Sequence, residues 1–101
     1  MKKAVNSIIE LLNIKGQSIS FAESITGGKL SSCFVDVPGA SKVYMGSAVC
    51  YSDYAKESVL NIPHGIIEKH SAVSHKCAYH MAKSALKLYN SDYAVATTGY
   101  A

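Results

Sequence analysis

The sequence predicts an α/β fold in which helices cover a sheet of short strands. Segments with helical spacing of apolar residues alternate along the chain with short apolar segments of strand composition, an order typical of layered α/β domains. Of the 101 residues, 49% are hydrophobic and 17% are charged, which is the balance of a folded globular protein. No internal repeat or linker-like stretch interrupts the sequence, so we expect a single domain over residues 1–101.

The first third of the chain predicts a helix, a strand and a second helix. Residues 2–14 carry apolar side chains at helical spacing, and Gly16 follows as a stop signal. Residues 18–23 alternate in polarity and predict a short strand. A second helix is expected over residues 29–36, since two glycines precede this segment and a proline-glycine turn follows it.

The middle of the chain predicts one strand and one helix, followed by a weaker signal. Residues 43–51 are β-branched, aromatic and apolar, as in a buried strand. Residues 53–60 predict a helix, with the side chain of Ser52 as its N-cap. Residues 64–70 predict at best one further helical turn before a loop.

The last third predicts a long amphipathic helix and a third strand. The helix is expected over residues 75–89, with Ser74 as its N-cap. The strand is expected over residues 93–99 and is short enough to be buried on both faces. The helix stripe expected to face the core consists of Cys77, Met81, Ala85 and Leu88.

Composition excludes a membrane span and argues against a secreted protein. No apolar run approaches the roughly 18–20 residues that a bilayer span requires. The first three residues have the charge of a signal peptide, but polar residues interrupt the apolar segment after them, so we expect a helix of a cytoplasmic protein. The three cysteines are widely spaced, which predicts reduced thiols and neither a disulfide framework nor a zinc site.

Basic residues give only a weak indication of nucleic-acid binding. All ten are lysines, and arginine is the residue favoured for planar recognition of phosphate and guanine. Lys76, His80, Lys83 and Lys87 line one face of the last predicted helix, and a solvated surface is favoured there over a nucleic-acid contact. Cys77 and His80 are spaced to share a metal ion, but two ligands do not make a site, so we expect no metal.

The segment after the first predicted strand concentrates polar groups and glycines. It does not match a nucleotide-binding phosphate loop, because Glu23 and Leu30 stand where that motif needs a glycine and a hydroxyl residue. A helix that begins there would still direct backbone N–H groups at an anion or a developing oxyanion. The alternative interpretation is a tight turn at Gly27-Gly28, with Ser24 or Thr26 capping the helix.

Ser24 is a candidate nucleophile if a base lies within hydrogen-bond reach, because a free serine hydroxyl is a weak nucleophile. Tyr51 ends the second predicted strand, and Lys56 lies in the first turns of the helix that follows. In a parallel sheet both reach the same edge as Ser24. A lysine acts as a base only when it is neutral, and burial favours the neutral form. The alternative is an exposed lysine on a solvated helix.

Five motifs occur in the order of a known family, and together they extend over most of the chain. The sequence resembles the C-terminal domain of the CinA family (competence/damage-inducible proteins), the nicotinamide-nucleotide amidases. The motifs are A-E-S-x-T-G-G at 22–28, D-V-P-G-x-S at 36–41, Y-S-x-x-A-K at 51–56, H-x-A-V-S at 70–74 and T-G-x-A at 98–101.

The resemblance implies a three-layer α/β/α fold and hydrolysis of the carboxamide of nicotinamide mononucleotide, giving nicotinate mononucleotide and ammonia without a metal or cofactor. By motif position Ser24 is the nucleophile, Lys56 activates it, and the Tyr51 hydroxyl assists proton transfer or holds the amide. The residues expected to bind the substrate or orient the serine are Glu23, Thr26, Gly27, Gly28 and Thr98.

The resemblance also predicts that the domain is incomplete. Similar domains continue after T-G-x-A with a Gly-Pro-rich loop, further strands, a basic residue for the nucleotide phosphate and a closing helix. The resemblance implies a small nucleotide substrate as the partner. The alternative function is a catalytically inactive, truncated domain that acts as a binding or assembly module. An uncovered sheet edge and apolar surface would favour a homo-oligomer.

Overall fold

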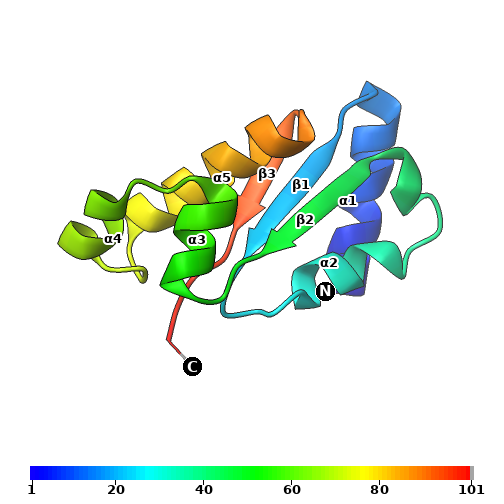
Figure 1. Ribbon diagram of the computed structural model, residues 1–101. Helices are drawn as coiled ribbons and strands as arrows, with labels where there is room; N and C mark the ends of the chain where they lie inside the picture. The colour runs from blue at the N-terminus through cyan, green and yellow to red at the C-terminus, as the bar shows by residue number, and fades with distance from the viewer. Residues whose placement is uncertain (101) are drawn as a thin grey trace.

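The computed structural model describes residues 1–100 and has a parallel three-stranded sheet at its centre (Figure 1). The spatial order of the strands is β2-β1-β3. Both outer strands run parallel to β1, whose residues are buried along its whole length. The strands are β1 (Ile19–Glu23), β2 (Tyr44–Val49) and β3 (Tyr93–Ala96).

Helices cover the sheet on both faces, so the fold has three layers (Figure 1). Helices α1 and α2 pack on one face, and α3, α4 and α5 lie over the other. A short 3-10 helix, η1, leads into β2. This arrangement confirms the predicted α/β/α fold. The helices are α1 (Lys2–Lys15), α2 (Lys29–Val35), η1 (Ala40–Lys42), α3 (Asp53–Leu60), α4 (His64–His70) and α5 (His75–Tyr89).

The two faces of the sheet bury different kinds of side chains. On the α1/α2 face, the Phe21 ring contacts the Phe34 ring edge-on with centroids 4.8 Å apart and stacks on the Tyr44 ring at 5.5 Å. On the α5 face, Ala22 is small enough to let the helix approach, and Met81 packs in the same cluster. Since side chains alternate along a strand, the central strand β1 supplies both cores.

The predicted bounds of α3 and α5 are confirmed, and each helix begins at the expected serine. The Ser52 Oγ accepts a hydrogen bond from the N–H of Ala55 at 3.1 Å. The Ser74 Oγ accepts one from the N–H of Cys77, also at 3.1 Å. Such a cap stabilises a helix by about 1 kcal/mol. The Ser52 cap also fixes where α3 starts relative to the sheet edge.

Two helical predictions are corrected. Residues 64–70 form a complete short helix, α4, because Pro63 opens it and Ile67 is buried in the core. Leu88 does not share the buried stripe of Cys77, Met81 and Ala85, since 54% of its surface is exposed. It lies near the end of α5, where it lines an open groove with residues that follow α3.

The third strand is shorter than predicted and is covered on one face only. Its sheet partner is β1, and no strand within residues 1–100 pairs with its other edge. Ala94 and Ala96 pack toward α5, whereas Tyr93 and Val95 are 45% and 43% exposed. The expectation of burial on both faces is therefore wrong, because nothing in this part of the chain covers the side of Tyr93 and Val95.

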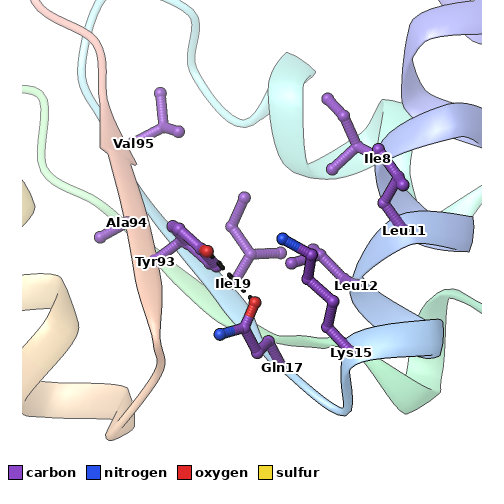
Figure 2. A pocket seen from close by; sticks show the side chains of 9 residues that line it. All are labelled: Ile8, Leu11, Leu12, Lys15, Gln17, Ile19, Tyr93, Ala94 and Val95. Atoms are coloured by element: carbon purple, nitrogen blue, oxygen red, sulfur yellow. Dashed lines mark hydrogen bonds between the residues drawn. The ribbon is translucent and has the colours of Figure 1, made fainter.

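An apolar groove of about 340 Å³ lies between α1 and β3 (Figure 2). The Tyr93 hydroxyl donates to the Gln17 side-chain oxygen at 3.1 Å across its floor. Ile8 and Leu11 form the α1 wall, and Val95 forms part of the opposite wall. We call this feature the α1/β3 groove; it is lined by Ile8, Leu11, Leu12, Lys15, Gln17, Ile19, Tyr93, Ala94 and Val95.

The helices, the cysteines and the metal-ligating side chains of residues 1–100 bear on the predictions from composition. None of the helices formed by residues 1–100 has the length and apolar content needed to cross a bilayer. Cys33, Cys50 and Cys77 carry free thiols, and the last two are buried. No group of three or more metal-ligating side chains is found among residues 1–100.

Candidate active site

Ser24 and Lys56 meet at the end of the sheet although 32 positions separate them. The Lys56 Nζ donates to the Ser24 Oγ at 2.8 Å and to the backbone carbonyl oxygen of Tyr51 at 2.8 Å. Only 5% of Ser24 and 2% of Lys56 is exposed. The lysine is therefore held in the interior, and the alternative of a solvated lysine does not describe it.

The fold explains why these two residues converge. Ser24 follows the last residue of β1, and the chain leaving the parallel neighbour β2 reaches the same edge before it enters α3 (Figure 1). Lys56 lies one turn after the Ser52 cap, and its N–H donates to the Ser52 carbonyl at 3.1 Å. Because helical side chains point back toward the helix N-terminus, Lys56 is directed at the sheet edge.

Two uncharged hydrogen-bond acceptors and two buried thiols lie near the Lys56 amine. Its two hydrogen-bond acceptors, a hydroxyl and a carbonyl oxygen, are both uncharged. Burial raises the pKa of the Cys50 thiol, and the nearby charge of Lys56 opposes that rise. Burial likewise raises the pKa of the Cys77 thiol, again against the charge of Lys56. Both thiols are therefore protonated at neutral pH and supply no negative charge to pair with the lysine.

Glu23, directly before the candidate nucleophile, is fully buried and accepts hydrogen bonds on both carboxylate oxygens. Oε1 accepts from the Thr26 hydroxyl at 2.6 Å and from the N–H groups of Gly28 and Leu30, each at 3.1 Å. Oε2 accepts from the N–H of Ser31 at 2.8 Å and from the Ser31 hydroxyl. Burial raises the pKa of Glu23, but the hydrogen bonds from Ser31 and Thr26 outweigh it, so the net pKa is lowered.

The glycine pair makes the tight turn between Ser24 and α2. Gly27 and Gly28 have φ values of 60° and 101°, in the left-handed region that side chains disfavour. The Gly27 N–H donates to the Ser24 carbonyl at 3.0 Å, which closes the turn. The helix cap differs from the expected one, because the carboxylate of Glu23 occupies the N–H groups at the start of α2 in place of a Ser24 or Thr26 side chain.

The structure places Thr97, and not Thr98, against the candidate nucleophile. The Thr97 Oγ1 accepts a hydrogen bond from the Ser24 N–H at 3.3 Å and lies 2.7 Å from the Thr26 Oγ1. The Thr98 hydroxyl donates to the Ala72 carbonyl at 2.7 Å. Sequence reasoning missed Thr97, although the alternation of side chains after a strand implies that one of two adjacent threonines faces Ser24. A substrate contact for Thr98 stays a prediction.

Tyr51 contributes its main chain to the pair. Its backbone carbonyl, rather than its hydroxyl, contacts Lys56, and the side chain is 67% exposed. The predicted hydroxyl role therefore stays a prediction about a complex with substrate.

The lysines of α5 lie elsewhere on the surface, where Lys76, Lys83 and Lys87 are exposed.

Together these features define an α/β domain with a buried serine–lysine pair at the carboxyl edge of a parallel sheet. The model of the family described as "CinA C-terminal domain" matches residues 1–101. The chain belongs to the CinA family.

Curated relatives are longer than this chain. A CinA-like protein of Fervidobacterium nodosum is 46% identical over 99% of the chain, which covers 24% of that protein. A CinA-like protein of Thermosipho melanesiensis is 49% identical over 87% of the chain, which covers 22% of that protein. The chain thus spans about a quarter of the length of these relatives.

Solved structures of the family have the same fold. The competence damage-inducible protein A of Klebsiella pneumoniae superposes with a TM-score of 0.96 at 31% identity, over 98% of this chain and 62% of that one. A CinA superfamily protein of Escherichia coli gives a TM-score of 0.93 at 33% identity, over 95% of this chain and 56% of that one. The chain corresponds to somewhat more than half of each solved protein.

Proposed function

We propose that this chain carries the nucleophile and base of an amidohydrolase that converts nicotinamide mononucleotide to nicotinate mononucleotide and ammonia. The observation that carries the proposal is the 2.8 Å contact between the buried Lys56 Nζ and the Ser24 Oγ. The choice of nicotinamide mononucleotide as the substrate rests on the resemblance to the CinA family. The geometry supports the chemistry, because an amide needs an activated nucleophile and a group that returns a proton to the leaving amine.

The proposed reaction begins with Lys56 neutral, so that the Ser24 hydroxyl donates to the Nζ lone pair along the same contact. The Ser24 Oγ attacks the carboxamide carbon, and its proton passes to Nζ. The proton then moves from Nζ to the amide NH₂ group as the C–N bond breaks, so that ammonia departs and an acyl ester remains on Ser24. Water attacks this ester with Lys56 again as the base, which releases the carboxylic acid and restores the hydroxyl.

The main chain holds the base in place for both half-reactions. The Tyr51 carbonyl fixes Nζ on the side of Ser24 at 2.8 Å, so the amine does not have to be ordered at the moment of proton transfer. Lys56 is one of the buried residues of α3, and this burial further limits its rotamers. A tyrosine hydroxyl or other donor that contacts the amide would complete the site from the exposed side.

Ammonia release from nicotinamide mononucleotide tests this proposal. Wild-type protein should release ammonia and nicotinate mononucleotide in equal amounts, and Ser24→Ala should abolish both. Ser41→Ala is the matched control, since Ser41 is an exposed serine outside the site. Turnover by Ser24→Ala equal to that of Ser41→Ala would refute the proposed nucleophile.

A second candidate function is assembly with another copy of this chain through the α1/β3 groove. The supporting observation is an apolar surface beside an unpaired strand edge, which together favour association with a further chain. Val95→Lys should then convert a dimer to a monomer in light scattering, whereas Val35→Lys, an exposed site on α2, should not. A wild-type monomer at high concentration would remove this candidate.

A further inference from the structure

We infer that Glu23 is a positioning residue for Ser24 and not a substrate ligand, acting through Thr26 and Thr97. This inference rests on the proposed reaction for its kinetic readout and on the hydrogen-bond geometry for its physical basis. Glu23 is 0% exposed, so it presents no surface to a small molecule at the sheet edge. Its oxygens are already engaged by donors from the turn and from α2.

The carboxylate fixes the direction of a chain of hydrogen bonds that ends at the nucleophile. An ionised carboxylate only accepts, so the Thr26 hydroxyl must give its single proton to Glu23 at 2.6 Å. The Thr97 hydroxyl, 2.7 Å from the Thr26 Oγ1, must then donate to Thr26. The free lone pairs of Thr97 Oγ1 are thereby available to the Ser24 N–H at 3.3 Å.

These hydrogen bonds connect the backbone of Ser24 to both the end of β3 and the start of α2. Thr97 follows β3, and its N–H donates to the Ala22 carbonyl at 2.9 Å, so the hydroxyl is placed by the sheet. The other carboxylate oxygen of Glu23 holds the first turn of α2 through Ser31. Ser24 therefore sits between an anchored helix and an anchored strand end, which keeps its Oγ in line with the Lys56 Nζ.

A neutral amide at position 23 cannot reproduce this network. Whichever way the side chain of Glu23→Gln is turned, its NH₂ group replaces one acceptor oxygen and faces N–H donors that need an acceptor. When the NH₂ group takes the place of Oε1, it donates to the Thr26 hydroxyl, and the Thr26 and Thr97 hydroxyls are then free to reverse direction. The expected consequence is a mobile Ser24, which lowers the rate of the chemical step more than it weakens substrate binding.

The test compares Glu23→Gln, Thr26→Val and Thr26→Ser in folded protein. The first two should lower kcat by about tenfold or more with KM within about twofold, as expected for loss of alignment without loss of binding. Thr26→Ser is the conservative rescue variant, since it keeps the hydroxyl and should recover most of the kcat that Thr26→Val loses. If Glu23→Gln fails to fold, Thr26→Val still decides, since it removes the middle hydroxyl and leaves the carboxylate.

A second readout does not depend on the natural substrate. Phenylmethylsulfonyl fluoride forms an O–S bond at an activated serine, with loss of fluoride and transfer of the hydroxyl proton to the base or to water. Mass spectrometry should show slower modification of Ser24 in Glu23→Gln and Thr26→Val than in wild type and Thr26→Ser. This result would support the inference even if nicotinamide mononucleotide were not turned over, which would count only against the proposed substrate.

Two results would overturn the inference. A raised KM with unchanged kcat in Glu23→Gln would make Glu23 a substrate ligand and leave the proposed reaction intact. Equal modification rates of Ser24 in wild type and in folded Thr26→Val would show that the hydroxyl chain does not position the nucleophile.

Discussion

The carboxyl edge of the sheet and the α1/β3 groove differ in how far their side chains find partners within the chain. At the carboxyl edge, the carboxylate, amine and hydroxyl groups are buried and hydrogen-bonded, and no buried side-chain nitrogen or oxygen within residues 1–100 lacks a partner. In the groove, Ile8, Leu11 and Val95 leave apolar surface exposed beside an unpaired strand edge (Figure 2). The serine–lysine pair is thus hydrogen-bonded within this chain, while the groove keeps apolar side chains and a strand edge that residues 1–100 do not cover.

This difference has a physical reason. Polar groups that are buried without partners cost about 1–3 kcal/mol each, so a buried catalytic network must be complete within the folded chain that carries it. A single exposed apolar side chain carries no comparable penalty, and only a contiguous apolar patch favours association with another chain. Substitutions in the two regions should therefore differ in size of effect. They should change the free energy of unfolding strongly in the interior and weakly in the groove.

The largest expected effect on stability is in the core that supports Lys56. Met81→Ala removes a fully buried side chain and should lower the free energy of unfolding by about 2–5 kcal/mol. Leu88→Ala, about two turns further along the same helix but half exposed, should change it by less than about 0.5 kcal/mol. Urea denaturation of both variants measures the difference, and equal losses would contradict the corrected stripe of α5.

The next effect is an acid-dependent loss of stability that depends on Glu23. Because the folded state lowers the pKa of this carboxyl, its stabilising contribution is complete above the ordinary pKa of 4.5 and is lost as pH falls through the lower folded value. Glu23→Gln should lower the free energy of unfolding by about 1–3 kcal/mol at pH 7 and flatten its dependence below pH 4.5. Denaturation at several pH values measures both, and an unchanged slope would contradict the prediction.

A smaller effect is expected in the α1/β3 groove. Val95→Thr places a hydroxyl on a surface that is 43% exposed, so the free energy of unfolding should change by less than about 0.5 kcal/mol in the monomer. The same substitution at a covered position would bury an unpaired hydroxyl and cost about 1–3 kcal/mol. A loss of that size, measured by urea denaturation at low protein concentration, would show that this face is covered and would break the comparison.

The smallest effect concerns the exposed ion pair between Glu57 of α3 and His64 of α4. The hydrogen bond and charge of Glu57, with the charge of Glu68, raise the pKa of His64 above 6.5. Its contribution to stability is therefore present below pH 6.5 and is lost as pH rises through the raised value. An NMR titration should show the pKa of His64 falling in Glu57→Gln, and an unchanged value would mean that the pair does not form in solution.

The sequence predicted those parts of the structure that depend on local signals. Ser52 and Ser74 marked the starts of α3 and α5, and the side-chain pattern predicted three strands alternating with helices, which the structure shows to run parallel. The rule that strand ends of an α/β sheet share one edge made Lys56 a candidate partner of Ser24, beside the alternative of a solvated lysine, and the structure brings the two into contact. The role of each residue in a reaction stays a prediction.

Features that depend on long-range packing were not predicted. The capture of the α2 amides by Glu23 requires knowing that its side chain turns back toward the helix, and the contact between Thr97 and Ser24 joins positions 73 apart. Exposure of Leu88 and Val95 depends on which neighbours cover a helix end and an edge strand. None of these features can be deduced from spacing alone.

The most direct test of the central claim, that Lys56 activates Ser24, compares Lys56→Met with Lys69→Met in the ammonia-release assay. Methionine keeps an unbranched apolar stem in the buried position and removes the amine, whereas Lys69 lies on α4 with its side chain exposed. The account predicts a loss of kcat of about a thousandfold or more for folded Lys56→Met, in the range seen when a catalytic base is removed, and wild-type activity for Lys69→Met. Wild-type turnover by Lys56→Met would contradict it.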